Sequence, residues 1–135
     1  PMSPDPRPIQ RPIPVLIGGH SDMALERAAR IGDGWIAASM SAERLAERRT
    51  TLGAMCQRDG RRVEDLRIVC GTSLTTSDDS ARRRSTPDRI ATEVRRYADA
   101  GVDHLVFGGQ ARTADASLRG LEILANQILP AVRNE

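Results

Sequence analysis

Short apolar segments alternate with longer amphipathic segments four times along this chain. The short segments show little alternation between apolar and polar residues, which is typical of parallel strands covered on both faces. The longer segments repeat their apolar residues at the spacing of one helical face. We therefore predict four strands, each followed by a helix, at Val15–Ile17, Trp35–Ala38, Arg67–Cys70 and His104–Phe107.

The first three predicted helices have recognisable beginnings and ends. A hydroxyl residue stands at the expected N-cap of each, and the third also has Pro87 at its first helical position, where proline is favoured. Glycine, the usual residue just past a helix, follows all three. The expected N-caps are Ser21, Ser41 and Thr86, and the expected stops are Gly32, Gly60 and Gly101.

The fourth helix is expected from about Ser117 to Ala131. Its apolar positions have helical spacing, so we expect them to face the core. They are Leu118, Leu121, Ala125, Ile128 and Leu129.

Four consecutive strand–helix units predict a parallel α/β sheet with right-handed crossovers. Both an open doubly wound sheet and half of a (β/α)8 TIM barrel satisfy this pattern, and periodicity does not separate them. The first 14 residues contain six prolines, so residues 1–13 are expected to form an extended arm. Residues 14–135 are expected to form one α/β domain.

The composition excludes several classes of function. The formal net charge is only +2 and no residue is lysine. The basic run Arg82–Arg84 has no interleaved aromatic residues, so we expect a solvated loop and no nucleic-acid partner. Cys56 and Cys70 lack zinc spacing and are expected to be small buried side chains in a reducing compartment. No stretch is apolar enough for a membrane span or a signal peptide, which favours a cytoplasmic protein without a membrane partner.

The most informative candidate site is the run Gly18-Gly19-His20-Ser21 after the first strand. Two glycines allow a ligand to approach the backbone closely. The N-terminus of the following helix favours an anion such as phosphate. An ordinary strand–helix turn with packing glycines is the alternative. For Ser21 a capping role is favoured over contact with phosphate, and His20 is either a site residue or an exposed loop histidine.

Other candidates follow the second and fourth predicted strands. Ser39 follows the second strand and is expected at the functional rim of a barrel. Gly108 and Gly109 follow the fourth strand, and Arg112 lies near enough in sequence to supply a charge; this turn is the second-choice anion site.

Two further polar residues are expected to have structural roles. Asp33 precedes the second strand, and its carboxylate is expected to bond nearby backbone. His104, beside Asp103, is expected to make a structural hydrogen bond. We find no nucleophile–base pair, paired carboxylates or metal cluster, so the catalytic residues are unknown.

Two long strings of this sequence resemble the luciferase-like monooxygenase superfamily, whose members are flavin- and deazaflavin-dependent oxidoreductases with a TIM-barrel fold. They are PIPVLIGGHSDMALERAARIGDGWIAASMSAERL and STPDRIATEVRRYADAGVDHLVFGG, and ILPAVR follows near the end. Family members are usually about twice as long, so the resemblance implies the C-terminal half of the barrel, with strands five to eight only.

The resemblance also carries expectations about function. It maps Gly18, Gly19 and His20 onto the turn that contacts the cofactor phosphate, and it implies the deazaflavin coenzyme F-420 or FMN as cofactor. The substrate would be a small organic molecule, taken through hydride transfer or monooxygenation. A catalytically silent half barrel and an unrelated α/β binding domain are the alternatives. Because half the barrel is absent, we expect a homo-oligomer or a partner chain that completes it.

Overall fold

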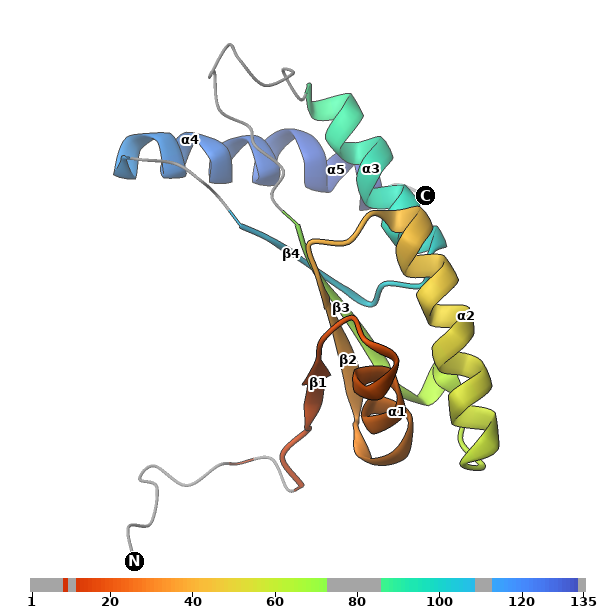
Figure 1. The fold of residues 1–135 in the computed structure, drawn as a ribbon. Helices are drawn as coiled ribbons and strands as arrows, with labels where there is room; N and C mark the ends of the chain where they lie inside the picture. Colours follow the sequence, from red (N-terminus) through yellow and green to blue (C-terminus); the bar gives the residue numbers. More distant parts are fainter. Residues whose placement is uncertain (1–8, 10–11, 73–85, 109–112, 134–135) are drawn as a thin grey trace, which may run out of the picture.

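The computed structural model describes residues 9, 12–72, 86–108 and 113–133. The order is strand, helix, four times over (Figure 1), with a short 3-10 turn at Val63–Asp65 and a π-helical turn at Leu124–Ile128 before a last short helix. The strands are β1 (Leu16–Gly18), β2 (Gly34–Ala38), β3 (Arg67–Thr72) and β4 (His104–Phe107). The helices are α1 (Asp22–Ile31), α2 (Ala42–Arg58), α3 (Pro87–Asp99), α4 (Ala114–Ile123) and α5 (Leu129–Arg133).

The four strands form one parallel sheet in the order β1-β2-β3-β4. This confirms the predicted fold class and all four strands, with ends that differ by no more than two residues from those expected. Gly34, which lies just before the predicted second strand, is the first residue of β2. A Cβ there would collide with the Arg67 carbonyl of the neighbouring strand, so only glycine allows this close pairing.

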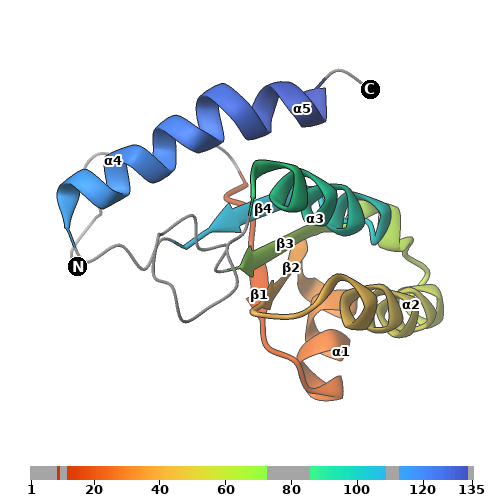
Figure 2. The same cartoon turned by 90° about the horizontal axis from the view of Figure 1, so that it is seen from above.

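The hydrophobic core lies between the sheet and the helices α1, α2 and α3 (Figure 2). Trp35 and Cys70 from the strands are completely buried in it, and the Tyr97 hydroxyl of α3 donates a 2.7 Å hydrogen bond to the Met40 carbonyl. Cys56 and Cys70 are both buried and free, as predicted.

Two aspartates fasten the amino ends of the strands in the same way. Oδ2 of Asp33 accepts a 2.7 Å hydrogen bond from the N–H of Val15. Oδ2 of Asp103 accepts one of 2.7 Å from the N–H of Ile68. Each aspartate immediately precedes an even-numbered strand and bonds to the start of the preceding odd-numbered strand. The predicted structural role of Asp33 is confirmed. Just before β4 a structural bond was expected of His104, and the bond found there is made by its neighbour Asp103.

The predicted N-caps of the first three helices are all found at their expected positions. The hydroxyls of Ser21 and Ser41 accept hydrogen bonds from the N–H groups of Ala24 and Arg44. Thr86 occupies the N-cap of α3, but its side chain makes no capping bond.

The prediction that the apolar residues of the last helix face the core is wrong for most of them. The helix begins earlier, at Ala114 after a Thr113 cap, and the π-helical turn interrupts it. Of the five residues expected to face inward, only Ile128 is buried, whereas Leu118 and Leu121 are 58% and 61% exposed. Figure 1 shows α4 extending past the end of the sheet. The apolar residues do recur at helical spacing, but the described residues provide nothing that covers this face of the helix.

The described residues leave the sheet face opposite the core open. Side chains alternate along a strand, so Leu16, Ile36, Val69 and Val106 point away from the core residues. None of these four is fully buried, and Val106 is 46% exposed. Among the described residues, no helix is long and apolar enough to cross a membrane. Most of the proline-rich arm, the run Arg82–Arg84 and the pair Gly109 and Arg112 lie outside the described residues.

Candidate functional site

The turn between β1 and α1, Gly18–Ser21, lies at the carboxyl end of the parallel sheet, where ligands bind in such folds. Gly19 has a φ of +123°, and a Cβ there would lie 2.9 Å from the Ala24 Cβ. Glycine is therefore required at this position. Gly18 is exposed and has an ordinary φ, and nothing lies within 4 Å of where its Cβ would be. This open space is where a ligand can reach the backbone.

Two side chains from other elements hold this turn in place. The buried Trp35 of β2 donates a 2.8 Å hydrogen bond from Nε1 to the Gly19 carbonyl. Arg48 of α2 donates to the His20 carbonyl at 3.0 Å and to Asp22 Oδ1 at 2.7 Å. Arg48 was missed in the sequence, since it lies 28 residues from His20 and no local motif marks it.

The first turn of α1 presents unused backbone donors to the same region. Ser21 accepts from the Ala24 N–H through both its hydroxyl and its carbonyl, so its capping role is confirmed. The N–H groups of Asp22 and Met23 lack acceptors within the described part of the chain, as expected for the start of a helix. The carboxylate of Asp22 would repel an anion there, but its ion pair with Arg48 offsets that charge.

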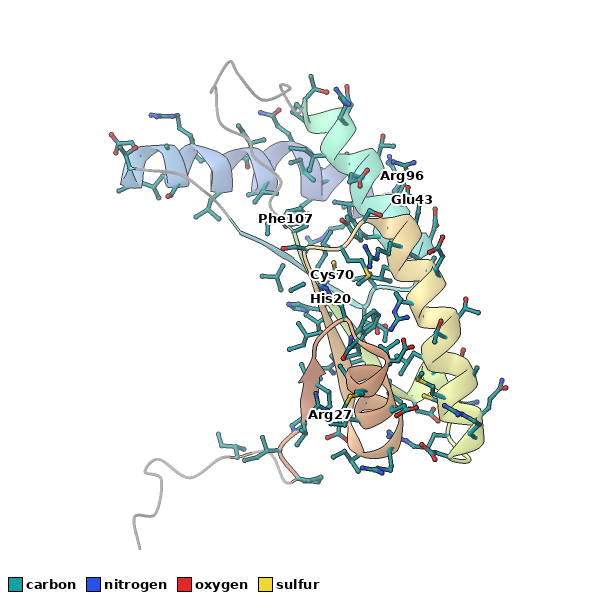
Figure 3. All side chains as sticks on the ribbon, viewed as in Figure 1. His20, Arg27, Glu43, Cys70, Arg96 and Phe107 are labelled. Carbon is teal, nitrogen blue, oxygen red and sulfur yellow. The ribbon has the colours of Figure 1, made fainter. Side chains whose placement is uncertain are left out.

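The remaining predicted residues divide between the two ends of the strands. Ser39 follows β2 with a φ of 53°, and its N–H donates a 2.7 Å bond to the Gly71 carbonyl. Gly108 follows β4, and its N–H donates to Thr72 at 2.9 Å. Both therefore lie at the same end of the sheet as the β1–α1 turn. His20 is exposed on that turn (Figure 3).

A hollow of about 700 Å³ opens at the opposite, amino end of the strands. Asp33 and Asp103 line it, but both carboxylates already bond backbone N–H groups. His104 also lies here, exposed at the start of β4, so the structure does not bring it near His20. Residues at the amino end of a barrel's strands serve stability. We therefore interpret the hollow as the amino end of the sheet face that the described residues leave open.

Shifted pKa values do not reveal a catalytic pair. Burial raises the pKa of the Cys56 and Cys70 thiols and of the Tyr97 phenol. These groups therefore stay protonated near neutral pH, which makes the thiols poor nucleophiles. In the described ranges, His, Cys, Asp and Glu form no group of three that would hold a metal ion. The arrangement is suited to binding and orienting a ligand.

Comparison with known proteins identifies the family. The family model described as luciferase-like monooxygenase matches residues 3–128. Among curated relatives, the uncharacterized proteins Rv0940c of Mycobacterium tuberculosis and Mb0965c of Mycobacterium bovis are each 30% identical over 135 residues. Each match covers 94% of this chain but only 41% of the relative. The chain thus spans less than half the length of these relatives.

This chain also covers only about half of each solved structure that is similar to it. A secondary alcohol dehydrogenase dependent on F-420, in complex with an F-420–acetone adduct, has a TM-score of 0.71 at 13% identity. The F-420-dependent tetrahydromethanopterin reductase of Methanopyrus kandleri has a TM-score of 0.73 at 12% identity. The alignments cover 90% of this chain and 49% and 51% of those chains. Riboflavin lyase with modified FMN and riboflavin gives 0.62 at 11% identity, covering 87% of this chain and 42% of that one.

The chain has four parallel βα units, and these neighbours are TIM-barrel enzymes of which it spans about half. It therefore belongs to the luciferase-like monooxygenase family, and its fold is half of that family's barrel.

Proposed function

We propose that this chain is the C-terminal half of a luciferase-like oxidoreductase barrel and binds the phosphate group of coenzyme F-420 or FMN. The β1–α1 turn carries this proposal, because it joins an open glycine backbone to the start of a helix. Family membership and the ligands named for the neighbouring structures, F-420 and FMN, support this class of cofactor.

The residues of the turn fit a phosphate group. The free N–H groups of Asp22 and Met23, together with the positive end of the helix dipole, favour a negative charge. Gly18 leaves the approach open. Ser39 and Gly108 lie at the same end of the sheet and would complete the rim around the ligand. Gly109 is proposed with them, although it lies outside the described residues.

When bound, a reduced deazaflavin would donate a hydride to the small organic substrate, and a reduced flavin would donate either a hydride or the electrons that activate oxygen for monooxygenation. The residues of this chain bind and orient. Trp35 and Arg48 bond the carbonyl groups of Gly19 and His20, which holds the turn in one conformation before a ligand binds. His20, exposed on the turn, is proposed to contact the phosphate.

The substitution Gly18→Val tests the site. It adds a branched side chain to open space without a strained φ, so it should lower the affinity for FMN or F-420 at least tenfold while the fold survives. Titration followed by cofactor fluorescence measures this affinity. Ala54→Val is the matched control, because it adds the same branched side chain to an exposed residue of α2, away from the turn. Equal affinities of wild type and Gly18→Val would remove this turn from the site.

Position 19 is less suitable for this test. A side chain there would combine an unfavourable φ of +123° with a 2.9 Å contact to Ala24. We therefore expect Gly19→Val to distort the turn as well as to obstruct a ligand. Loss of binding in that variant would not separate distortion from a blocked ligand.

A catalytically silent half barrel that binds a phosphorylated ligand is the second candidate. The sheet face left open by the described residues favours it, because the active site of a TIM barrel is built from the loops of all eight strands and this chain has four. We expect this chain by itself to bind cofactor but to show little or no turnover. Absorbance measures whether the reduced cofactor is oxidised when substrate is added. Such oxidation would contradict this expectation and show that the chain alone is an active enzyme.

A further inference from the structure

The exposed apolar side chains gather at the two ends of the βα series. At one end they include Val15, Met23 and Ile31, and at the other Val106, Leu118 and Leu121. Among the described residues, no exposed large apolar side chain belongs to β2, α2, β3 or α3. The large exposed apolar side chains are thus confined to the two outer units and the segments beside them.

The backbone at these same ends is also incomplete. Within the described part of the chain, β1 pairs only with β2 and β4 only with β3, so each leaves one row of N–H and C=O groups without strand partners there. Open edges flanked by apolar surface favour association with another chain. Both edges belong to one parallel sheet, so a partner that joins both must itself offer two parallel edges.

We propose that this partner is a second copy of the same chain, and that the two copies close an eight-stranded barrel in which β4 of each pairs with β1 of the other. A two-fold axis generates both junctions from the same pair of edges, as in closed dimers generally. The open inner face of one copy then covers that of the other.

The register of the junction follows from a repeat within the chain. The aspartate bonds make Val15 equivalent to Ile68 and Asp33 equivalent to Asp103. By this equivalence, Leu16 corresponds to Val69, and Val106 corresponds to Ile36. Ile36 pairs with Val69 where β2 meets β3. The same relation pairs Val106 with Leu16 of the partner subunit, and both side chains point to the inner face.

This register satisfies an independent geometric condition. Following the strand pairs around one copy from Leu16, and across the proposed junction, leads to the level of Pro12 of the partner subunit, four residues earlier. The second copy adds the same displacement, so the full circuit is eight residues. A shear of 8 is the value of closed TIM barrels. The chain's own edges therefore match each other in the way that barrel closure requires.

A cysteine pair tests this junction directly. In the variant Leu16→Cys with Val106→Cys, the two thiols of one copy lie on opposite edges of the sheet, separated by three strand spacings of roughly 14 Å in all and by a further displacement along the strands. That is too far for a disulfide within the copy. We expect oxidation to give covalent dimers that reduction reverses, and the native mass of the unmodified chain to be that of two chains at micromolar concentration.

The matched control is Leu16→Cys with Leu105→Cys. Leu105 packs against the core on the other face of the sheet, so this pair should give no more covalent dimer than wild type, whose cysteines are buried. Circular dichroism of each variant checks that the sheet is retained. A single-chain mass for the wild type would overturn the proposal. So would a folded dimer in which the first pair fails to cross-link, because the interface would then lie elsewhere.

Discussion

Trp35 and Arg48 show how single side chains position a turn that is distant in sequence. Trp35 is fully buried, and its one polar atom bonds the Gly19 carbonyl. Arg48 reaches the next carbonyl and the first acidic residue of α1 from another helix. The sequence marked the glycines and the cap of the turn, because their conformational roles are local. It did not mark the two residues that hold it, because their contacts depend on packing.

At the residue scale we expect Trp35→Phe to lower the free energy of unfolding by about 1–3 kcal/mol, since a hydrogen bond and some buried volume are lost. Circular dichroism in urea measures this, as the variant lacks the chain's one tryptophan. Tyr97→Phe is the control, because it also removes a donor to a backbone carbonyl, at Met40. Both should lose stability, and only Trp35→Phe should lose affinity for FMN. Equal affinities would show that the indole does not position the turn.

At the scale of elements, the sequence predicted where helices begin, but it did not predict the burial of the last helix. Ser21 and Ser41 cap their helices because a short hydroxyl side chain reaches the free N–H groups from its own N-cap. The face of the last helix depends on what lies beside it, and the described residues bury only Ile128 there. An apolar stripe on a helix indicates which residues are stabilised by burial. It does not indicate whether another part of this chain packs against them.

The three N-caps give a graded prediction. Ser21→Ala and Ser41→Ala should each lower the free energy of unfolding by about 1 kcal/mol, because each removes an observed capping bond. Thr86→Ala should cost clearly less, because the Thr86 side chain makes no such bond. Urea denaturation of the three variants in parallel measures the difference. A loss at Thr86 as large as at the serines would contradict this assignment.

At the scale of the whole molecule, the described residues form an α/β half barrel and leave its inner face largely uncovered. Among these residues the buried core lies on the helix side of the sheet, and each edge strand has one neighbour. A barrel removes its edges by closing. The incomplete surfaces of this chain are therefore concentrated where the missing strands of a barrel would lie.

If two copies close the barrel, stability should depend on concentration. Association that requires the folded state stabilises it by mass action, so the melting temperature should rise as the chain concentration is increased. Differential scanning calorimetry over a hundredfold concentration range measures this. The variant Val106→Asp, which puts a charge on the exposed edge strand, should remove the dependence, whereas Ala46→Asp on the exposed side of α2 should not. A melting temperature independent of concentration in the wild type would speak against a dimer.

The sequence by itself determined the four βα units, the parallel sheet, three helix caps and the glycine turn, because periodicity, capping and glycine conformation are local properties. It left the open sheet and the half barrel as alternatives. The tertiary structure decided which side chains hold the turn and that Asp33 and Asp103 bond equivalent strands. It also decided that the described residues leave the last helix and one sheet face uncovered. These features depend on which surfaces meet in space, and strand pairing and packing between distant segments decide that.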